Sequence, residues 1–361
     1  MLKQQKIFFD FLRFSIGSES EIPSSLKEAD WKELYAIAKK QCLVGVLFDG
    51  IKKLPAEQVG MKMGLLFQWI AKNRMLEKAN VRLNDAAIQI SEWFRKKGFR
   101  TCILKGQGNA LMYPNPYSRT PGDIDIWVEG GDKRVISFVR SISPHEKACY
   151  HHIEFPSYKG VEVEVHYRPS FLLCFWHNRK LQNFYERMKE EQFSHRVMLG
   201  KQGEIAIPTA EFNLIFQLTH IYAHLMNEGI GLRQLVDYYY VLISDDLLLI
   251  RDRVQKELKE LGLWKFAGAI MYIMQEVFGM PASRLIVPPN EKCGKFVLNE
   301  VLEAGNFGKH DERNRFGRSQ LGHNLQRVYR DMRLVRYFPA EALCEPVLRL
   351  WQFFWRVKNK K

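Results

Sequence analysis

Two short stretches in which apolar and acidic residues alternate constrain the fold of this chain more than any other feature. The first ends the segment 103–128, where Asp123 and Asp125 stand two residues apart in an apolar run. Side chains alternate between the two faces of a β-strand, so both carboxylates share one face. The other face carries Ile124, Ile126 and Val128. The segment therefore predicts a strand with one buried face and one acidic face.

The second stretch, VEVEVH at 161–166, repeats this pattern. Its valines point one way, whereas Glu162, Glu164 and His166 point the other way. If the two strands are neighbours, one face of the sheet presents two aspartates and a third carboxylate together. Alternation alone leaves both Glu162 and Glu164 open as that third carboxylate.

A glycine turn precedes the first acidic strand. Lys105 and Gly106 follow an expected strand at 100–104 and lead into a short helical segment. Free N–H groups at the start of a helix attract phosphate. Lys105 and Arg119 add positive charge nearby, although Arg119 has the alternative of pairing with Asp123. The turn is thus a candidate site for a triphosphate.

This combination of residues suits nucleotidyl transfer. In that reaction a hydroxyl attacks the α-phosphorus of a nucleoside triphosphate (NTP) while pyrophosphate leaves, and two divalent ions can clamp the attacking and leaving oxygens. Mg²⁺ (or Mn²⁺) takes hard oxygen ligands, chiefly carboxylates, phosphate and water. We expect Asp123, Asp125 and the third carboxylate to hold these ions, and Asp125 or Glu164 to assist deprotonation of the acceptor hydroxyl.

Helical patterns occupy most of the remaining chain. Residues 61–97 form a long helical pattern that ends in lysines before a glycine. Residues 209–280 show helical spacing, with Thr209 as the expected cap. The stretch 325–361 is also helical, and its prolines are expected to break it. These are Pro339 and Pro346.

Strand patterns occur only within residues 99–200, and helical patterns lie on both sides of them. We therefore expect an α+β fold with a small mixed-sheet core between helical regions. The expected parts are an N-terminal helical region (1–77), an α/β core (78–204) and a C-terminal helical domain (205–361).

Composition limits the partners and the compartment. The net charge of +14 favours anionic partners such as nucleotides, RNA or anionic lipid. The six cysteines are scattered without a CxxC motif, so neither a zinc ribbon nor a disulfide framework is expected. Asp10 and Arg13 interrupt the N-terminal apolar run, and no stretch is long enough for a membrane span. We expect a soluble cytoplasmic protein without stable membrane association.

Three further groups have less specific patterns. His220 and His224 have the i, i+4 spacing of a helix, and we expect them to pack or to line a cleft rather than to bind a metal. Arg233 and Asp237 have the same spacing, which favours an ion pair within one helix over a role in shaping the nucleotide pocket. The polar segment 305–324 is predicted to be a loop whose basic residues are candidates for contacting phosphate or RNA. These are Lys309, Arg313, Arg315 and Arg318.

The order of these motifs resembles the polymerase-β-like nucleotidyltransferase superfamily. The similar features are LKG at 104–106, Arg119, the DxD pair, a strand that ends in ExH, and helices on both sides. More narrowly, the chain resembles a branch of uncharacterised bacterial nucleotidyltransferases. Those similarities lie in WKELYAIAKKQCLVGVL, in the HxxxH and LRxxxD motifs at 220–237, and in GNFG at 305–308.

The resemblance implies a role for each residue of the expected site. It assigns metal binding to Asp123, Asp125 and Glu164, and it places Lys105, Gly106 and Arg119 near the triphosphate. It does not name the acceptor, so a small molecule, RNA and a protein all stay open, as do the base preference and the oligomeric state.

One departure from the family pattern concerns the turn. The superfamily turn is typically glycine followed by glycine or serine, whereas this chain reads Lys105-Gly106-Gln107-Gly108. A serine hydroxyl that would contact phosphate is missing, so backbone amides, Gln107 or Lys105 must substitute for it. The alternative is a catalytically inactive nucleotide- or RNA-binding protein on the same scaffold.

Overall fold

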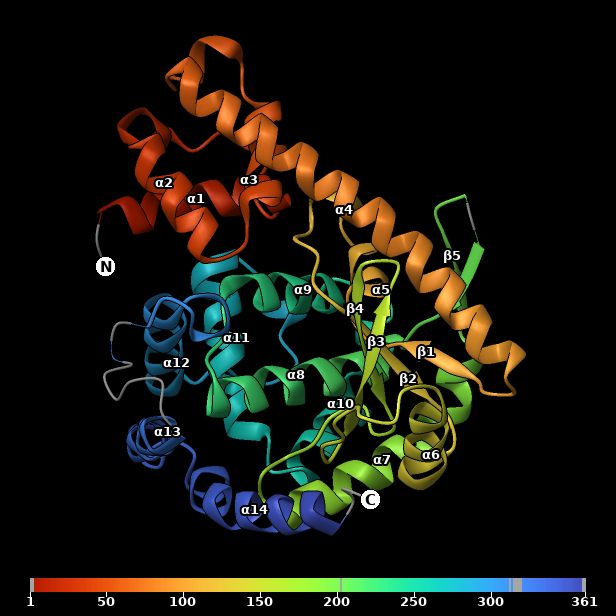
Figure 1. The fold of residues 1–361 in the computed structure, drawn as a ribbon. Coiled ribbons are helices and arrows are strands. Elements are labelled where there is room, and N and C mark those ends of the chain that lie inside the picture. Colours follow the sequence, from red (N-terminus) through yellow and green to blue (C-terminus); the bar gives the residue numbers. More distant parts are fainter. Residues whose placement is uncertain (1–2, 202, 312, 314–319, 359–361) are drawn as a thin grey trace.

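The computed structural model describes residues 3–201, 203–311, 313 and 320–358 and has a mixed α+β fold (Figure 1). The α-helices are α1 (Lys3–Ile16), α2 (Trp31–Lys40), α3 (Val44–Lys53), α4 (Met63–Lys96), α5 (Gln107–Ala110), α6 (Gly131–Ile142), α7 (Phe175–Ser194), α8 (Ala210–Asn227), α9 (Leu232–Leu242), α10 (Leu247–Glu260), α11 (Trp264–Phe278), α12 (Glu291–Ala304), α13 (Gln320–Leu334) and α14 (Pro339–Lys358). The strands are β1 (Thr101–Ile103), β2 (Ile124–Val128), β3 (His152–Tyr158), β4 (Val161–His166), β5 (Arg196–Leu199) and β6 (Gly203–Ala206). The predicted fold class is confirmed.

The central sheet has four strands in the order β1-β2-β4-β3. β1 pairs antiparallel with β2, and β3 pairs antiparallel with β4. β2 and β4 are parallel neighbours, because helix α6 and strand β3 return the chain to the same end of the sheet before β4 begins. β5 and β6 form a separate two-stranded hairpin.

Each face of the central sheet packs against a different set of helices. The apolar face, which carries Ile126 and Val165, shares a core with Phe94 of α4 and Val139 of α6. On the opposite face, Trp127 stacks near Phe193 and Phe212, with ring centroids 4.6 Å and 5.8 Å away. Figure 1 shows the sheet between the long helix α4 and the C-terminal helices. The acidic face of β2 and β4 is therefore turned towards α8 and its neighbours.

The N-terminal helices share one hydrophobic core with the C-terminal helices. Arg13 in α1 donates to the backbone carbonyl of Val277 in α11 at 3.2 Å. Gln41 links the same regions, because its side chain accepts from the backbone N–H of Leu232 at 2.8 Å and donates to the Val301 carbonyl at 3.3 Å. The predicted boundary at residues 77/78 falls inside the continuous helix α4. The division into three parts stays a prediction.

The local predictions of helix ends are confirmed only in part. Thr209 occupies the N-cap position of α8 but makes no side-chain cap bond, since its hydroxyl donates to the Gln192 side chain at 3.2 Å instead. The predicted break at Pro339 is confirmed, because α13 ends at Leu334 and Pro339 begins α14, where a missing N–H costs nothing. The predicted break at Pro346 is wrong, because Pro346 lies on an exposed face inside α14.

The predicted loop at 305–324 is also too long, because α13 already begins at Gln320. The stretch 314–319, with Arg315 and Arg318, lies outside the described residues. Arg313 donates to Glu300 at 2.8 Å and to Asp311 at 2.7 Å, so its guanidinium is bound within the fold. Among the described helices, none is both long enough and apolar enough to cross a membrane.

Candidate active site

The parallel pairing of β2 and β4 brings three acidic residues together. Asp125 lies beside Glu164 in the register, and Asp123 lies one residue before β2. One oxygen from each of the three carboxylates lies within 4.8 Å of the other two. We call these residues the carboxylate trio. Glu162 is exposed and outside the trio, so the register separates the two glutamates that alternation leaves open.

The three carboxylates differ in pKa because cations reach them unequally. Burial alone would raise the pKa of Asp125, but Lys105 and His166 outweigh burial and hold it well below its usual range. The charge of Asp125, together with burial, raises the pKa of Asp123 to about 6. Burial also opposes ionisation of Glu164, but the hydrogen bond from His166 gives that carboxyl a net lowered pKa. Asp123 therefore carries the least compensated negative charge.

Lys105 and Gly106 reach the trio because β1 continues into the turn beside β2. The Leu104 N–H donates to the Asp125 carbonyl, and Lys105 Nζ then lies 2.8 Å from Asp125 Oδ1. Gly106 has φ 58° and ψ −107°, a backbone conformation that only glycine adopts without strain. The turn therefore presents its lysine to the acidic face and leads directly into α5.

Gln107 does not reach the acidic face with its side chain. It is 2% exposed, and its amide donates to the side chain of Asn84 and to the backbone carbonyl of Asn80, both in α4. Of the groups expected to replace the missing serine, this leaves the backbone amides of the turn and Lys105.

Three histidines lie beside the trio: His152 on β3, His151 directly before β3, and His166 at the end of β4. His166 Nε2 lies 3.0 Å from Asp125 Oδ1 and 3.4 Å from Glu164 Oε2. Burial alone would lower the pKa of His166, but these two carboxylates raise it to about 9. Burial dominates for the other two and lowers the pKa of His152 to about 4 and that of His151 well below its usual range. At neutral pH, without bound metal, His166 is thus charged and the other two are neutral.

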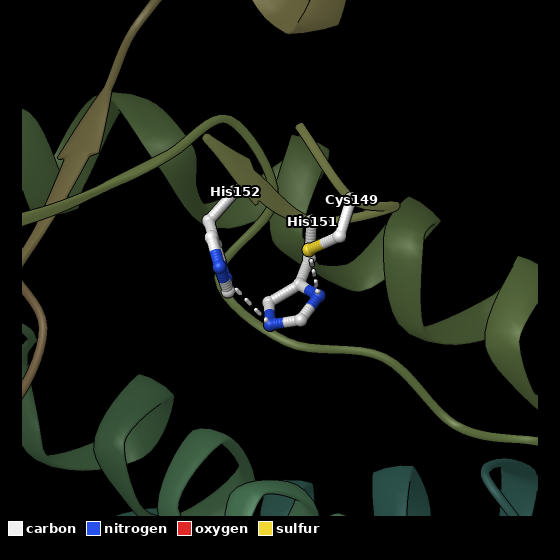
Figure 2. A group of neighbouring side chains, drawn as sticks. All are labelled: Cys149, His151 and His152. Carbon is white, nitrogen blue, oxygen red and sulfur yellow. Dashed lines mark hydrogen bonds between the residues drawn. The ribbon is translucent and has the colours of Figure 1, made fainter. Parts of the chain in front are cut away.

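His151 and His152 belong to a chain of polar side chains that begins at Cys149 (Figure 2). Cys149 Sγ lies 3.4 Å from His151 Nδ1, and His151 Nε2 lies 3.0 Å from His152 Nδ1. His152 Nδ1 in turn lies 3.5 Å from Glu164 Oε2. The chain therefore ends at the carboxylate trio.

Arg119 is bound by Asp237 of α9 rather than by Asp123. Its Nε and one terminal nitrogen each donate to a different Asp237 oxygen at 2.8 Å, and both side chains are buried. Tyr113 donates to the same carboxylate at 2.6 Å. The predicted ion pair between Arg233 and Asp237 is wrong, because Asp237 is directed across the interface to Arg119.

Arg233 is a second buried guanidinium at this place. One of its terminal nitrogens donates to the Thr120 carbonyl at 3.1 Å, whereas its buried Nε has no hydrogen-bond partner among the residues that the structure describes. Burial and the charge of Arg119 lower the pKa of Arg233. Two guanidinium groups and one carboxylate, Asp237, therefore line the same cavity as the trio, and of the two only Arg119 forms an ion pair with that carboxylate. The excess of positive charge favours the binding of an anion.

A cavity of about 340 Å³ opens between the acidic face of the sheet and the C-terminal helices. Its volume falls in the range of small-molecule sites. The predicted site residues that line it are Asp123, Asp125, Glu164, Lys105, Gly106 and Arg119, whereas Gln107 is not among the lining residues. The helices contribute polar residues that include His220, His224, Arg233, Arg327 and Arg349.

His220 and His224 line this cavity from α8, as expected for a cleft role. Burial is the main cause that lowers the pKa of His220, so its Nε2 accepts from Lys105 Nζ at 3.2 Å. His224 Nδ1 lies 3.4 Å from Glu228 Oε2. His220 thus orients the lysine that faces Asp125.

Sequence reasoning missed His151 and His152, and it favoured an ion pair with Asp237 over the place in the cavity lining that Arg233 has. The tight turn at Lys159 and Gly160 joins β3 to β4 and pairs Tyr158 with Val161. An irregularity between Phe155 and Tyr158 then shifts the register by one residue, and only the shifted register pairs His152 with His166. The alternation of residue types does not show this shift. No local pattern places Arg233 either, because it reaches the site through the packing of α9.

The comparisons with known proteins give the family of this chain. Residues 27–279 match the family model described as an uncharacterised nucleotidyltransferase. The chain therefore belongs to this family of uncharacterised nucleotidyltransferases. No curated protein matches the chain.

One solved structure resembles part of the chain: the crystal structure of an antigenic nucleotidyltransferase-like protein from Paracoccidioides brasiliensis. The two chains are 14% identical, and the match covers 50% of this chain and 90% of that chain with a TM-score of 0.29. A likeness at this TM-score carries no inference about the site.

Proposed function

We propose that this protein is a metal-dependent nucleotidyltransferase that moves NMP from an NTP to an acceptor hydroxyl and releases pyrophosphate. The observation that carries the proposal is the carboxylate trio, which gathers Asp123, Asp125 and Glu164 at a cavity beside Lys105. The donor set fits Mg²⁺ or Mn²⁺, because it consists of oxygen ligands and carries uncompensated negative charge at Asp123. Membership of the polymerase-β-like superfamily, a bacterial source and a cytoplasmic location are part of the same proposal.

In the proposed reaction, the acceptor oxygen forms a bond to the α-phosphorus while the bond from that phosphorus to the bridging oxygen breaks. The acceptor proton passes to Asp125 or Glu164, and pyrophosphate leaves with the electrons of the broken bond. Bound divalent cations supply charge neutralisation for the oxygens that enter and leave. Asp123, Asp125 and Glu164 would hold those cations, and the positive groups at the cavity would orient the triphosphate.

Positive groups at the cavity would bind the triphosphate. Lys105 and the backbone at Gly106 approach from the sheet. Arg233 approaches from α9, and its Nε has no partner in the described part of the chain. Arg119 contributes its charge from within its pair with Asp237. The acceptor would enter from the helical side of the cavity, and a small molecule, RNA and a protein all stay open as acceptors.

The proposal is tested by replacing Asp123 with asparagine, which removes a ligand charge at nearly constant volume. Pyrophosphate release from all four NTPs, with Mg²⁺ or Mn²⁺, should fall by roughly 100-fold or more, since even outer partners of metal sites cost about 10- to 100-fold. Glu162→Gln is the matched control, because Glu162 lies on the same strand as Glu164 but is exposed. Unchanged turnover in the Asp123→Asn protein would contradict the proposal.

A second candidate function is a catalytically inactive nucleotide- or RNA-binding protein. It is favoured by the turn, which lacks the serine hydroxyl and buries the Gln107 side chain against α4. This function predicts NTP or RNA binding without pyrophosphate release. A binding titration beside the turnover assay distinguishes the two functions.

A further inference from the structure

A second set of potential metal ligands lies beside the carboxylate trio and shares Glu164 with it. His152 and His166 are cross-strand partners in the β3–β4 pair. Glu164 Oε2 lies 3.5 Å from His152 Nδ1 and 3.4 Å from His166 Nε2. One ligand atom from each of these residues lies within 4.8 Å of the other two. Two imidazole rings and one carboxylate therefore lie close enough together to bind one ion.

The distances within this set suit a divalent cation that takes nitrogen and oxygen ligands, such as Zn²⁺ or Co²⁺. We call such an ion a zinc-class cation. Zn²⁺ binds imidazole nitrogen and carboxylate oxygen at about 2.0–2.2 Å in a tetrahedron, which separates two ligand atoms by roughly 3.4 Å. Two histidines and one carboxylate also form the protein ligands of several catalytic zinc and non-haem iron sites, which keep positions open for water or substrate. Mg²⁺, in contrast, prefers oxygen ligands and usually retains several waters.

The outer contacts of His166 orient it as a ligand. Its Nδ1 lies 3.3 Å from the backbone carbonyl of Arg168, which accepts the N–H and leaves Nε2 directed at the carboxylates. Metal-bound histidines almost always donate their second ring N–H in this way. His166 Nε2 also lies 3.0 Å from Asp125 Oδ1, so an ion at this nitrogen would be next to the carboxylate trio.

The hydrogen-bonded side chains drawn in Figure 2 orient the ring of His152. If Cys149 donates to His151 Nδ1, then His151 donates from Nε2 to His152 Nδ1 and leaves that nitrogen unprotonated. A cation at Nδ1 would replace this hydrogen bond. The backbone of the segment is fixed, because the Cys149 N–H donates to the His152 carbonyl at 2.9 Å and the Tyr167 N–H donates to the His151 carbonyl at 3.0 Å.

Cys149, His151 and His152 form a competing ligand set whose atoms also lie within 4.8 Å of one another. In that set, however, His151 turns a different ring nitrogen towards each neighbour, and one ion can use only one of them. Cys149 is also absent from the lining of the cavity, whereas His152, Glu164 and His166 all line it. The geometry therefore favours the set that contains Glu164.

We propose that His152, Glu164 and His166 bind a zinc-class divalent cation next to the Mg²⁺ site, with Glu164 shared between the two. A catalytic role for this ion rests on the proposed function. The inference deepens that function, because it adds a metal with nitrogen ligands to the same site. Binding itself does not require turnover.

The test is a titration of metal-stripped protein with Co²⁺ in excess Mg²⁺, followed by visible absorption. We expect one Co²⁺ per chain, with the intense bands of an ion of low coordination number, and competition by Zn²⁺. His152→Ala should weaken Co²⁺ binding by roughly 10-fold or more. His145→Ala is the control, because His145 is exposed and outside the cavity lining. His166→Gln, with its fold checked by circular dichroism, should also weaken binding.

Three results would overturn the proposal. They are full displacement of Co²⁺ by Mg²⁺, equal Co²⁺ affinity in wild-type and His152→Ala protein, and a thiolate-to-cobalt absorption band that disappears in Cys149→Ser. The last result would place the ion on the competing set. Absence of pyrophosphate release with every metal would instead refute the proposed function and leave the Co²⁺ result unaffected, so the two failures are distinguishable.

Discussion

The buried pair between Arg119 and Asp237 gives the most quantitative prediction, because it joins the loop before the acidic strand to the C-terminal helices. The two side chains are 5% and 7% exposed, and two donor–acceptor distances of 2.8 Å link them. The loop end of the pair is anchored by Asn80 of α4, whose amide donates to the Arg119 carbonyl at 2.8 Å. Asp237→Asn would remove the charge that balances Arg119 and Arg233.

Loss of one partner of a buried ion pair costs about 3–5 kcal/mol, because the remaining charge stays desolvated. We expect the free energy of unfolding of Asp237→Asn to fall by that amount in urea denaturation followed by tryptophan fluorescence, with an unchanged dependence on urea. The double variant Arg119→Met/Asp237→Leu should lose less, since it leaves neither member of the pair unpaired.

The matched control is Glu204→Gln, which breaks the pair between Arg196 and Glu204 on the β5–β6 hairpin. Those side chains are 47% and 51% exposed and lie 3.1 Å apart. Exposed pairs of this kind contribute about 0–1 kcal/mol. If Asp237→Asn cost no more than Glu204→Gln, the reasoning that the pair holds the loop against the helices would be refuted.

Two further predictions concern the turn and His166. Gly106→Ala should destabilise the protein by about 1–3 kcal/mol. The cause is backbone strain alone, since the nearest atom to the added Cβ is the Asp123 carbonyl oxygen at an ordinary contact distance of 3.6 Å. The control is Gly64→Ala, in the first turn of α4 with open space around it, which should not destabilise the protein. In metal-free protein, His166 should titrate in NMR near the pKa of about 9 that its carboxylate partners give it against the effect of burial. Because this pKa lies above the unfolded value of about 6.5, the stabilisation is complete below pH 6.5 and is lost as the pH rises through 9. A midpoint near 6.5 in the folded protein would contradict this prediction.

The parts of the fold that depend on local pattern follow from the sequence. The helical pattern at 61–97 becomes α4, and the alternation at 161–166 becomes β4, with the apolar faces buried as predicted. The sequence also predicts that the acidic residues lie together, provided that the two strands with an acidic face are neighbours in the sheet. Choosing Glu164 over Glu162 required the register, because a shift of two residues preserves the alternation.

Other features depend on contacts between distant segments and have no local signal. Spacing within α9 indicates a pair between Arg233 and Asp237, yet Asp237 faces Arg119 across the interface between core and helices. The burial of Gln107 follows from the position of Asn84 on α4, which the turn sequence does not encode. Long-range packing thus decides which polar side chains reach the cavity.

The distribution of charge across the trio shows why Asp123 is the most informative residue to replace. Asp125 is contacted by both nearby cations, Lys105 and His166, and Glu164 by His166. Among the described residues, no salt bridge reaches Asp123, whose pKa is raised to about 6 by the charge of Asp125 and by burial. A divalent cation would therefore relieve more repulsion at Asp123 than at the other two carboxylates. Asp123→Asn removes that charge without leaving an ion-pair partner unpaired, so a loss of activity in this variant would report on cation binding rather than on folding.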